Sequence, residues 1–389
     1  MSVRQAVLVD TVRTPIGRGH AEKGALRAIP PVELLRHVID ALLARTGLSQ
    51  AKVDELITGC VTLRGEQGNN VSRLAGLLSG LPVTTNAFTV QRACGSSQEA
   101  VHLASLKVLA GDADYVIAGG VESMGRVPMF SDIGGHTVVN EALKAKYEII
   151  HQGESAERLA EIHGLTQHEL DAFSVESHRR AWAAQSEGWF RSQIAPIDGL
   201  DASGASVTVA LDEAIRASLD LAKMATLPRP FRPETGKITA GNASTIADGA
   251  GAVLVADRAT AERDGFRPRA RIVARACAAG DPTLALMEVV PAARAAVAKA
   301  GLSLDDIDLF EVNEAFAPVP VLFMKQLGVP HEKLNVNGGA IAHGHPLGAT
   351  GVILMGKLVS ELERRGARYG LQTMCIAQGM ATATIIERL

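Results

Sequence analysis

The chain has 389 residues, of which 47% are hydrophobic and 21% are charged, and its formal net charge is −3. This length is too great for one ordinary core and predicts two domains or one large duplicated unit. The small net charge and the scattered lysines and arginines argue against nucleic acid or an anionic membrane surface as a partner. Apolar runs are too short to span a bilayer, and the N-terminus lacks a secretory signal pattern, so we expect a cytoplasmic protein with no membrane partner.

Strand-like and helix-like segments alternate along the chain, which is the pattern of an α/β fold. A strand is expected at Val7–Val9, a helix over residues 95–110 and another strand at Tyr115–Ala118. The stretch 121–245 is richer in glycine, proline, histidine and charge, as expected for an inserted binding or lid region. Strand character returns at Gly251–Ala256.

The two ends of the chain repeat one another. Residues 47–57 read GLSQAKVDELI, and 254 residues later the chain reads GLSLDDIDLFE. A second pair of matching segments, starting at Gly111 and Gly366, recurs at nearly the same offset ahead of an apolar run. Two such matches predict duplicated halves. We therefore expect an N-terminal half at 1–120, completed by about 246–270, a loop domain at 121–245 that covers the active site, and a C-terminal half at 271–389.

The cysteines Cys60, Cys94, Cys277 and Cys375 are too far apart in sequence for a structural zinc pattern, so no metal site is expected. Cys94 follows an extended segment and precedes the helix expected at 95–110. Unpaired N–H groups and the dipole at a helix N-terminus stabilise an anion. We therefore expect Cys94 to be a nucleophile with a lowered pKa, and a buried cysteine ahead of a capping serine is the alternative.

The segment from Asn335 to Gly351 holds five glycines and leads into a helix. The offset of 254 residues places Cys94 opposite Gly348 in this segment, so the two loops are expected to lie together. His345, held between a glycine and a proline, could then act as general base toward Cys94. The segment lacks the G-x-x-x-x-G-K-[ST] pattern of a phosphate-binding loop. His343 is either a second titrating group that tunes His345 or a solvent-facing or backbone-bonded histidine.

Two further motifs complete the pattern. Asn313-Glu-Ala-Phe316 follows the strand-like Leu309–Val312, and Cys375-Ile-Ala-Gln-Gly379 ends another predicted strand. Together with Cys94-Gly-Ser-Ser and Asn337-Gly-Gly-Ala-Ile-Ala-His-Gly-His345-Pro, in this order, they make the sequence resemble the thiolase family over essentially its whole length. The resemblance implies a five-layer αβαβα fold made of two similar halves plus an inserted loop domain.

The resemblance also implies chemical roles. Cys94 would attack the keto carbon of a 3-ketoacyl-CoA, His345 would activate that thiol, and Cys375 would protonate the departing acetyl-CoA carbanion. His345, with a water held by Asn313, would form one oxyanion site, and the backbone N–H groups of Cys94 and Ala377 would form the other. The residues expected to contact substrate or CoA are Ser244, His151, Gln152, Arg216 and Phe316.

The activity that the resemblance favours is thiolysis of 3-ketoacyl-CoA by CoA, as in β-oxidation, by a homodimer or homotetramer without a metal or cofactor. CoA itself is a substrate. Gln152 puts a polar group at a position that is usually apolar, which leaves the preferred acyl group open. An acetoacetyl-CoA-forming acetyl-CoA acetyltransferase is the first alternative.

Three other functional hypotheses remain as alternatives. A condensing ketosynthase shares the fold, but such enzymes typically use one cysteine with two histidines, or a Cys-His-Asn set. The presence of Asn313 together with a second cysteine, Cys375, favours a thiolase. A non-catalytic CoA-binding protein on the same scaffold belongs to a different class of function. A nicotinamide oxidoreductase is disfavoured, because the strand–GxGxxG–helix unit with a following acid is missing.

Overall fold

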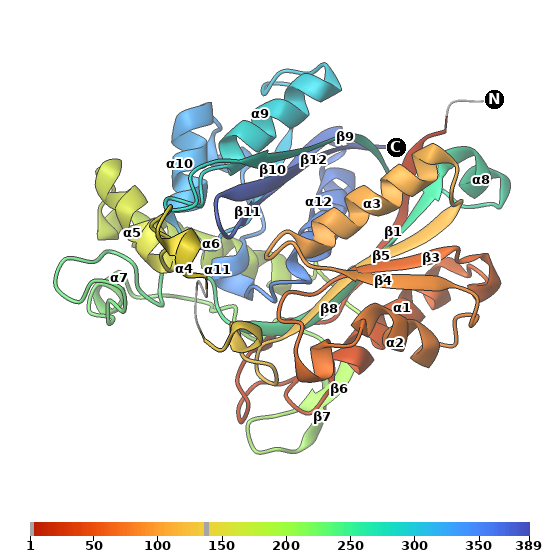
Figure 1. Cartoon of the computed structure of the whole chain (residues 1–389), viewed down its shortest axis with the longest axis horizontal. Coiled ribbons are helices and arrows are strands. Elements are labelled where there is room, and N and C mark those ends of the chain that lie inside the picture. The colour runs from red at the N-terminus through yellow and green to blue at the C-terminus, as the bar shows by residue number, and fades with distance from the viewer. Residues whose placement is uncertain (1–3, 136–139) are drawn as a thin grey trace.

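The structure, a computed structural model, describes residues 4–135 and 140–389. In this part of the chain ten strands form one sheet, in the order β10-β11-β12-β9-β1-β8-β5-β3-β4, with β2 paired to β8 (Figure 1). The strands are β1 (Ala6–Arg13), β2 (Gly17–Arg18), β3 (Glu55–Gly59), β4 (Asn86–Val90), β5 (Tyr115–Ser123), β8 (Ala247–Asp257), β9 (Ala270–Ala279), β10 (Leu309–Val312), β11 (Tyr369–Ile376) and β12 (Met380–Arg388).

Helices flank the sheet, and a separate hairpin of β6 (Ile197–Leu200) and β7 (Ser206–Val209) lies beside it. The longer helices are α1 (Pro31–Thr46), α2 (Val71–Leu78), α3 (Ser96–Ala110), α5 (Gln152–Ile162), α6 (Gln167–Ser186), α9 (Val289–Ala300), α10 (Pro318–Leu327) and α12 (Thr350–Arg365). The short helices are α4 (Glu141–Lys144), α7 (Leu221–Met224), α8 (Arg258–Arg263) and α11 (Ala340–His343). Within the described ranges, none of these helices is long and apolar enough to cross a membrane.

The sheet repeats one arrangement twice. The order β3-β5-β8-β1 in the first half matches β10-β11-β12-β9 in the second. In both halves the first pair is parallel and the next two pairs are antiparallel. Local detail repeats too: Asp54 accepts from the amide N–H of Tyr115 at 2.9 Å, and Asp308 accepts from that of Tyr369 at 2.9 Å. The duplication predicted from sequence is therefore confirmed.

The elements stack in five layers (Figure 1). The helices α1 and α2 cover the first half of the sheet, and α9 and α10 cover the second. Between the two halves, α3 and α12 pack against each other. The halves join where β1 meets β9, with Val7 opposite Arg271 and Leu8 opposite Ala270. This is the αβαβα fold expected from sequence.

The core explains why the central helices are so apolar. A helix enclosed by protein on all sides lacks a polar face. Residues 350–359 of α12 are all buried, and Val352, Met355 and Leu358 share an apolar cluster with strands of both halves. Lys357 in the same stretch is a charged exception. In the region between the halves, α5 and α6 contribute side chains to the core of the second half. The boundaries 121 and 245 of the expected loop domain stay predictions.

Candidate active site

Cys94 lies in the turn between β4 and α3, two residues before the helix begins at Ser96, and so near a helix N-terminus as predicted. The preceding Ala93 has a φ of 41°, in the left-handed region that disfavours a residue with a Cβ, so backbone strain is localised beside the thiol. At Gly95 an added Cβ would meet Ile376 Cδ1 at 2.4 Å. Only a glycine lets this turn lie so close to β11, the strand that carries Cys375.

The predicted lowering of the Cys94 pKa is wrong. Its side chain packs in an apolar cluster with Met124, Leu347, Leu354, Met374 and Ile376. Burial, followed by the nearby Cys375, raises the pKa of Cys94 above the ordinary value, because a thiolate would lose its hydration there. The backbone N–H of Cys94 opposes this shift only in part. Resting Cys94 is therefore a thiol and needs a base to remove its proton.

His345 has the protonation state that such a base requires. Its Nδ1 lies 2.6 Å from Thr350 Oγ1, and the Thr350 hydroxyl donates to the Pro346 carbonyl at 2.9 Å. Because the hydroxyl has a single hydrogen, Nδ1 must carry the imidazole proton, and Nε2 keeps its lone pair. Burial lowers the pKa of His345 to about 4, so the ring is neutral and Nε2 can accept a proton.

Asn313, directly after β10, and Cys375, within β11, lie beside that lone pair. The Asn313 Nδ2 is 3.3 Å from His345 Nε2 and 3.9 Å from Cys375 Sγ. Burial raises the pKa of Cys375 to about 11, so this residue is a protonated thiol, as a proton donor must be. The structure thus brings His345, Asn313 and Cys375 together, and Cys94 is near enough for Cys375 to affect its pKa. The roles assigned to them from sequence stay predictions.

The second backbone group expected in the site, Ala377, lies in the turn between β11 and β12. The next two residues, Gln378 and Gly379, have φ values of 61° and 74°. A Cβ is disfavoured at such angles, so Gln378 is a strained position. The Gly379 carbonyl accepts from Gly280 N–H at 2.7 Å, which fastens this turn to the end of β9. The oxyanion role of the Cys94 and Ala377 amides stays a prediction.

Two contributors to the site were missed from sequence. Thr350 sets the His345 tautomer, as described above. Glu122, fully buried at the end of β5, accepts from the backbone N–H groups of Val61, Thr62 and Gly348 at 2.9, 3.1 and 2.9 Å. It therefore joins the glycine-rich loop of the second half to a loop of the first. Its position in Gly119-Gly-Val-Glu-Ser-Met124 was the available signal, but a motif does not show which amides a carboxylate reaches.

Four of the five residues expected to contact the substrate gather in one place. The His151 ring stacks on Phe231 with centroids 5.0 Å apart, and Phe231 meets Phe316 edge-on at 6.4 Å. Ser244 joins them, because the residue before it forms a β-bridge with Phe316. Gln152 follows His151 at the start of α5, and its Nε2 is buried with no hydrogen-bond partner in the described part of the chain.

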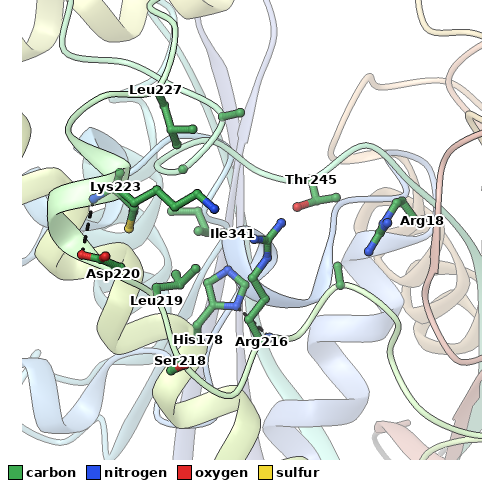
Figure 2. Close-up of a pocket in the computed structure, with 14 residues that line it drawn as sticks. Arg18, His178, Arg216, Ser218, Leu219, Asp220, Lys223, Leu227, Thr245 and Ile341 are labelled. Atoms are coloured by element: carbon green, nitrogen blue, oxygen red, sulfur yellow. Dashed lines mark hydrogen bonds between the residues drawn. The ribbon is translucent and has the colours of Figure 1, made fainter.

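The fifth, Arg216, lines a separate cavity of about 390 Å³ beside α6 and α7 (Figure 2). Arg18 and Lys223 also line it, and Asp220 is the one acidic side chain among its described lining residues. Figure 2 shows the charged ends of Arg216 and Lys223 converging in the cavity. Thr245 forms part of the wall, and its carbonyl accepts from the His345 amide at 2.9 Å. An excess of positive charge favours an anionic ligand.

One group of three side chains among the described residues has the spacing of metal ligands: Glu99, His102 and Cys277. The Arg92 guanidinium donates to Cys277 Sγ at 3.2 Å and to Glu99 at 2.5 Å. A cation that already occupies the space between the ligands would repel a metal ion, so we assign no metal to this group.

The fold and this arrangement of side chains define a class of proteins. Residues 6–259 match the family described as "Thiolase, N-terminal domain" and residues 266–388 match "Thiolase, C-terminal domain". The chain belongs to the thiolase family.

Similar proteins fall within that family. The chain is 41% identical to a 3-ketoacyl-CoA thiolase of Klebsiella pneumoniae over 391 residues and 43% identical to one of Shewanella frigidimarina over 392 residues, in each case covering 100% of both chains. The structure of human mitochondrial 3-ketoacyl-CoA thiolase matches with a TM-score of 0.88 and 34% identity, covering 100% of both chains. An acetyl-CoA acetyltransferase of Bacillus anthracis matches with a TM-score of 0.90 and 35% identity, covering 100% of this chain and 99% of that one.

Proposed function

We propose that this protein cleaves 3-ketoacyl-CoA with CoA, giving acetyl-CoA and an acyl-CoA shortened by two carbons. The observation that carries the proposal is the contact between Asn313 Nδ2 and His345 Nε2 beside two buried thiols. It supports the roles that we assign to His345 as neutral base, to Asn313 as hydrogen-bond donor and to Cys375 as protonated acid. The full-length similarity to 3-ketoacyl-CoA thiolases supports the same reaction.

In the first half-reaction His345 Nε2 takes the proton of the Cys94 thiol as sulfur attacks the 3-keto carbon. The carbon–carbon bond between C2 and C3 then breaks, and its electron pair stays on C2 as the enolate of acetyl-CoA. The Cys375 thiol gives its proton to C2, so acetyl-CoA leaves and the acyl group remains on Cys94. A neutral thiol suits this step, because a carboxylate would repel the enolate.

In the second half-reaction the Cys375 thiolate takes the proton of the CoA thiol, and the CoA sulfur attacks the thioester on Cys94. The Cys94 sulfur leaves and regains its proton from His345. All three side chains return to their starting protonation states. Both steps place negative charge on a carbonyl oxygen, and removing one oxyanion donor typically costs about 100- to 1000-fold in rate.

We place the phosphates of CoA in the cavity lined by Arg18, Arg216 and Lys223. The cations provide the charge that phosphate groups require. Its wall at Thr245 is hydrogen-bonded to the backbone of His345, so a thioester arm leading inward from the cavity approaches the general base. Ser244, His151, Gln152 and Phe316 are the residues that we expect along the arm and the acyl group.

Purified protein mixed with CoA and a series of 3-ketoacyl-CoAs, beginning with acetoacetyl-CoA, tests the proposal by loss of the substrate. The Cys94→Ser variant is expected to lose turnover, and intact-protein mass spectrometry of wild type should detect the acyl group on Cys94. Cys277→Ser is the matched control, because Cys277 is exposed and lies outside the site. Turnover confined to acetoacetyl-CoA would favour the acetyltransferase alternative. A wild-type protein inactive on every chain length would contradict the proposal.

We further propose that the active protein is a homo-oligomer. The strand β4 is the edge of the sheet, so one side of its backbone is open to pairing. The adjacent helix α2 exposes Leu74, Leu77 and Leu78 by 39%, 43% and 52%. Light scattering on wild type and Leu77→Lys tests this surface, and a monomeric wild type would contradict the proposal.

We also propose a cytoplasmic location, which the free cysteines support.

A further inference from the structure

A buried lysine contacts the two segments that carry Asn313 and His345. Lys357, in α12, is 1% exposed, and its Nζ contacts three acceptors. These are the Gly338 carbonyl at 2.6 Å, His343 Nε2 at 3.3 Å and Glu311 Oε2 at 3.4 Å. An ammonium group has three hydrogens to donate, so this set satisfies it completely. Buried charges that persist in proteins are paired and hydrogen-bonded in this way.

His343 is a fixed acceptor in this network. Its Nδ1 lies 2.9 Å from the Gly344 carbonyl, and a carbonyl can only accept, so Nδ1 carries the hydrogen. The lone pair on Nε2 therefore faces Lys357. Burial, with Lys357 next, lowers the pKa of His343 well below its ordinary value. The prediction that His343 is a second titrating group is thus wrong, and the alternative prediction that it is a backbone-bonded histidine is confirmed.

Glu311 connects the same lysine to the other catalytic segment. Glu311 lies in β10, two residues before Asn313, and is 3% exposed. Burial raises the pKa of Glu311 to about 7, and the Lys357 ammonium opposes that shift. His343 likewise stands two residues before His345. Lys357 therefore contacts both the strand that precedes Asn313 and the loop that carries His345. The Nδ2 atom of Asn313 lies 3.3 Å from Nε2 of His345.

Lys357 contacts the loop that carries His345 at two points on the N-terminal side of that histidine. Its Nζ reaches Gly338, two residues before the short helix α11, and His343, the last residue of that helix. Gly338 has a φ of 68° and Gly344 a φ of 102°, so the chain turns sharply on either side of the helix. The direction of His345 is therefore set by the hydrogen bonds that hold the loop, which are those of Lys357 together with the bond from the His345 amide to the Thr245 carbonyl.

We propose that Lys357 and His343 are positioning residues for the reaction proposed above: they fasten the His345 loop to β10 and so set the spacing of Asn313 and His345. The inference rests on the proposed function. Displacing a catalytic group by about 1 Å can cost on the order of 100-fold in rate. The two residues act through that pair and touch no substrate.

Three variants test the inference in the turnover assay. His343→Leu removes the acceptor for Lys357, whereas His343→Gln can keep an acceptor oxygen near the position of Nε2. Lys357→Met removes the ammonium and keeps the length of the side chain. We expect His343→Leu and Lys357→Met to lower kcat roughly 10- to 100-fold with the KM for CoA within about twofold of wild type, and His343→Gln to keep most of the activity.

A double-mutant cycle separates positioning from stability. In an Asn313→Ala background, Lys357→Met should cost much less in kcat than in wild type, because the spacing that it sets has lost one partner. Arg269→Met is the matched control: it breaks ion pairs to Asp10 and to Glu363 of α12, so it should lower the melting temperature without lowering kcat at 25 °C.

The outcomes distinguish the two proposals. Active wild type with His343→Leu as fast as wild type would overturn the inference and leave the proposed function intact. Equal losses in His343→Leu and His343→Gln, or losses fully additive with Asn313→Ala, would also overturn it. Inactive wild type would overturn both. If Lys357→Met fails to fold, the comparison of His343→Leu with His343→Gln still decides.

Discussion

The amide nitrogen of His345 donates to the carbonyl of Thr245 at 2.9 Å, and Thr245 is at the same time part of the wall of the cationic cavity. One hydrogen bond therefore connects the loop of the general base to the place where we expect the CoA phosphates. The cations of the cavity lie in a different region from the catalytic pair, so binding and chemistry are expected to respond separately to substitution.

Arg216→Met and Lys223→Met should raise the KM for CoA about tenfold or more and leave kcat nearly unchanged, because each variant removes a charged donor to phosphate. With a truncated pantetheine thioester that lacks the nucleotide phosphates, both variants should behave like wild type. Steady-state kinetics measure this, with Arg179→Met, 66% exposed on α6, as the control. A fall in kcat at unchanged KM would contradict the assignment of the cavity.

Thr350→Val should lower kcat roughly five- to tenfold, because the Nδ1–H of His345 loses a hydrogen bond worth about 1 kcal/mol and the ring loses its fixed tautomer. Thr350→Ser keeps the hydroxyl and should stay within about twofold of wild type. The two variants, compared in the same assay, separate the hydroxyl from the packing. Equal rates for valine and serine would show that the hydroxyl does not orient the base.

The acid limb of kcat/KM should lie near pH 4 and not near pH 6.5, because burial lowers the pKa of His345 to about 4 and the ring stays a free base above that value. At the other end, Cys375, with a pKa of about 11, should remain a proton donor through pH 9. Rates measured from pH 4.5 to 9 check this. An acid midpoint near 6.5 would contradict it.

The free energy of unfolding should also depend on the protonation of His345. Unfolded His345 binds a proton near pH 6.5 and the folded protein binds it only near pH 4, so the unfolded state holds more protons between these values. The free energy of unfolding should therefore fall as pH drops from about 6.5 to about 4, by about 3 kcal/mol for this residue. Urea unfolding at several pH values measures it, and His345→Gln should flatten the slope. A slope that the variant leaves unchanged would assign the effect to other groups.

Gln152→Met should raise the free energy of unfolding by about 1 kcal/mol, because a buried Nε2 without a partner costs about 1–3 kcal/mol. It should also shift kcat/KM toward longer apolar acyl chains. The control is Gln185→Met, which removes an acceptor for the Asp212 amide and should have the opposite sign in stability. Lower stability for Gln152→Met would indicate that the Gln152 amide has a structural partner.

The sequence by itself was sufficient for the α/β class and the duplication, and it named Cys94, Asn313, His345 and Cys375 as candidates for the site. The repeat beginning at Gly47 and Gly301 marks the ends of α1 and α9, where both glycines have left-handed φ values of 70° and 67°. Such local requirements are written into single residues, since a positive φ favours glycine wherever it occurs. The motifs that contain Cys94, Asn313, His345 and Cys375 likewise name the groups but not their surroundings.

Only the tertiary structure decided the protonation states and the supports of the site. The pKa of Cys94 was expected to be low from its place before a helix, but it is high because Met124, Met374 and other apolar side chains exclude water. No motif indicates that Lys357 and His343 are partners. Their contact is set by how α12 packs beside the loop. Desolvation and long-range hydrogen bonds depend on what folding brings near, and periodicity and spacing along a chain carry no record of that.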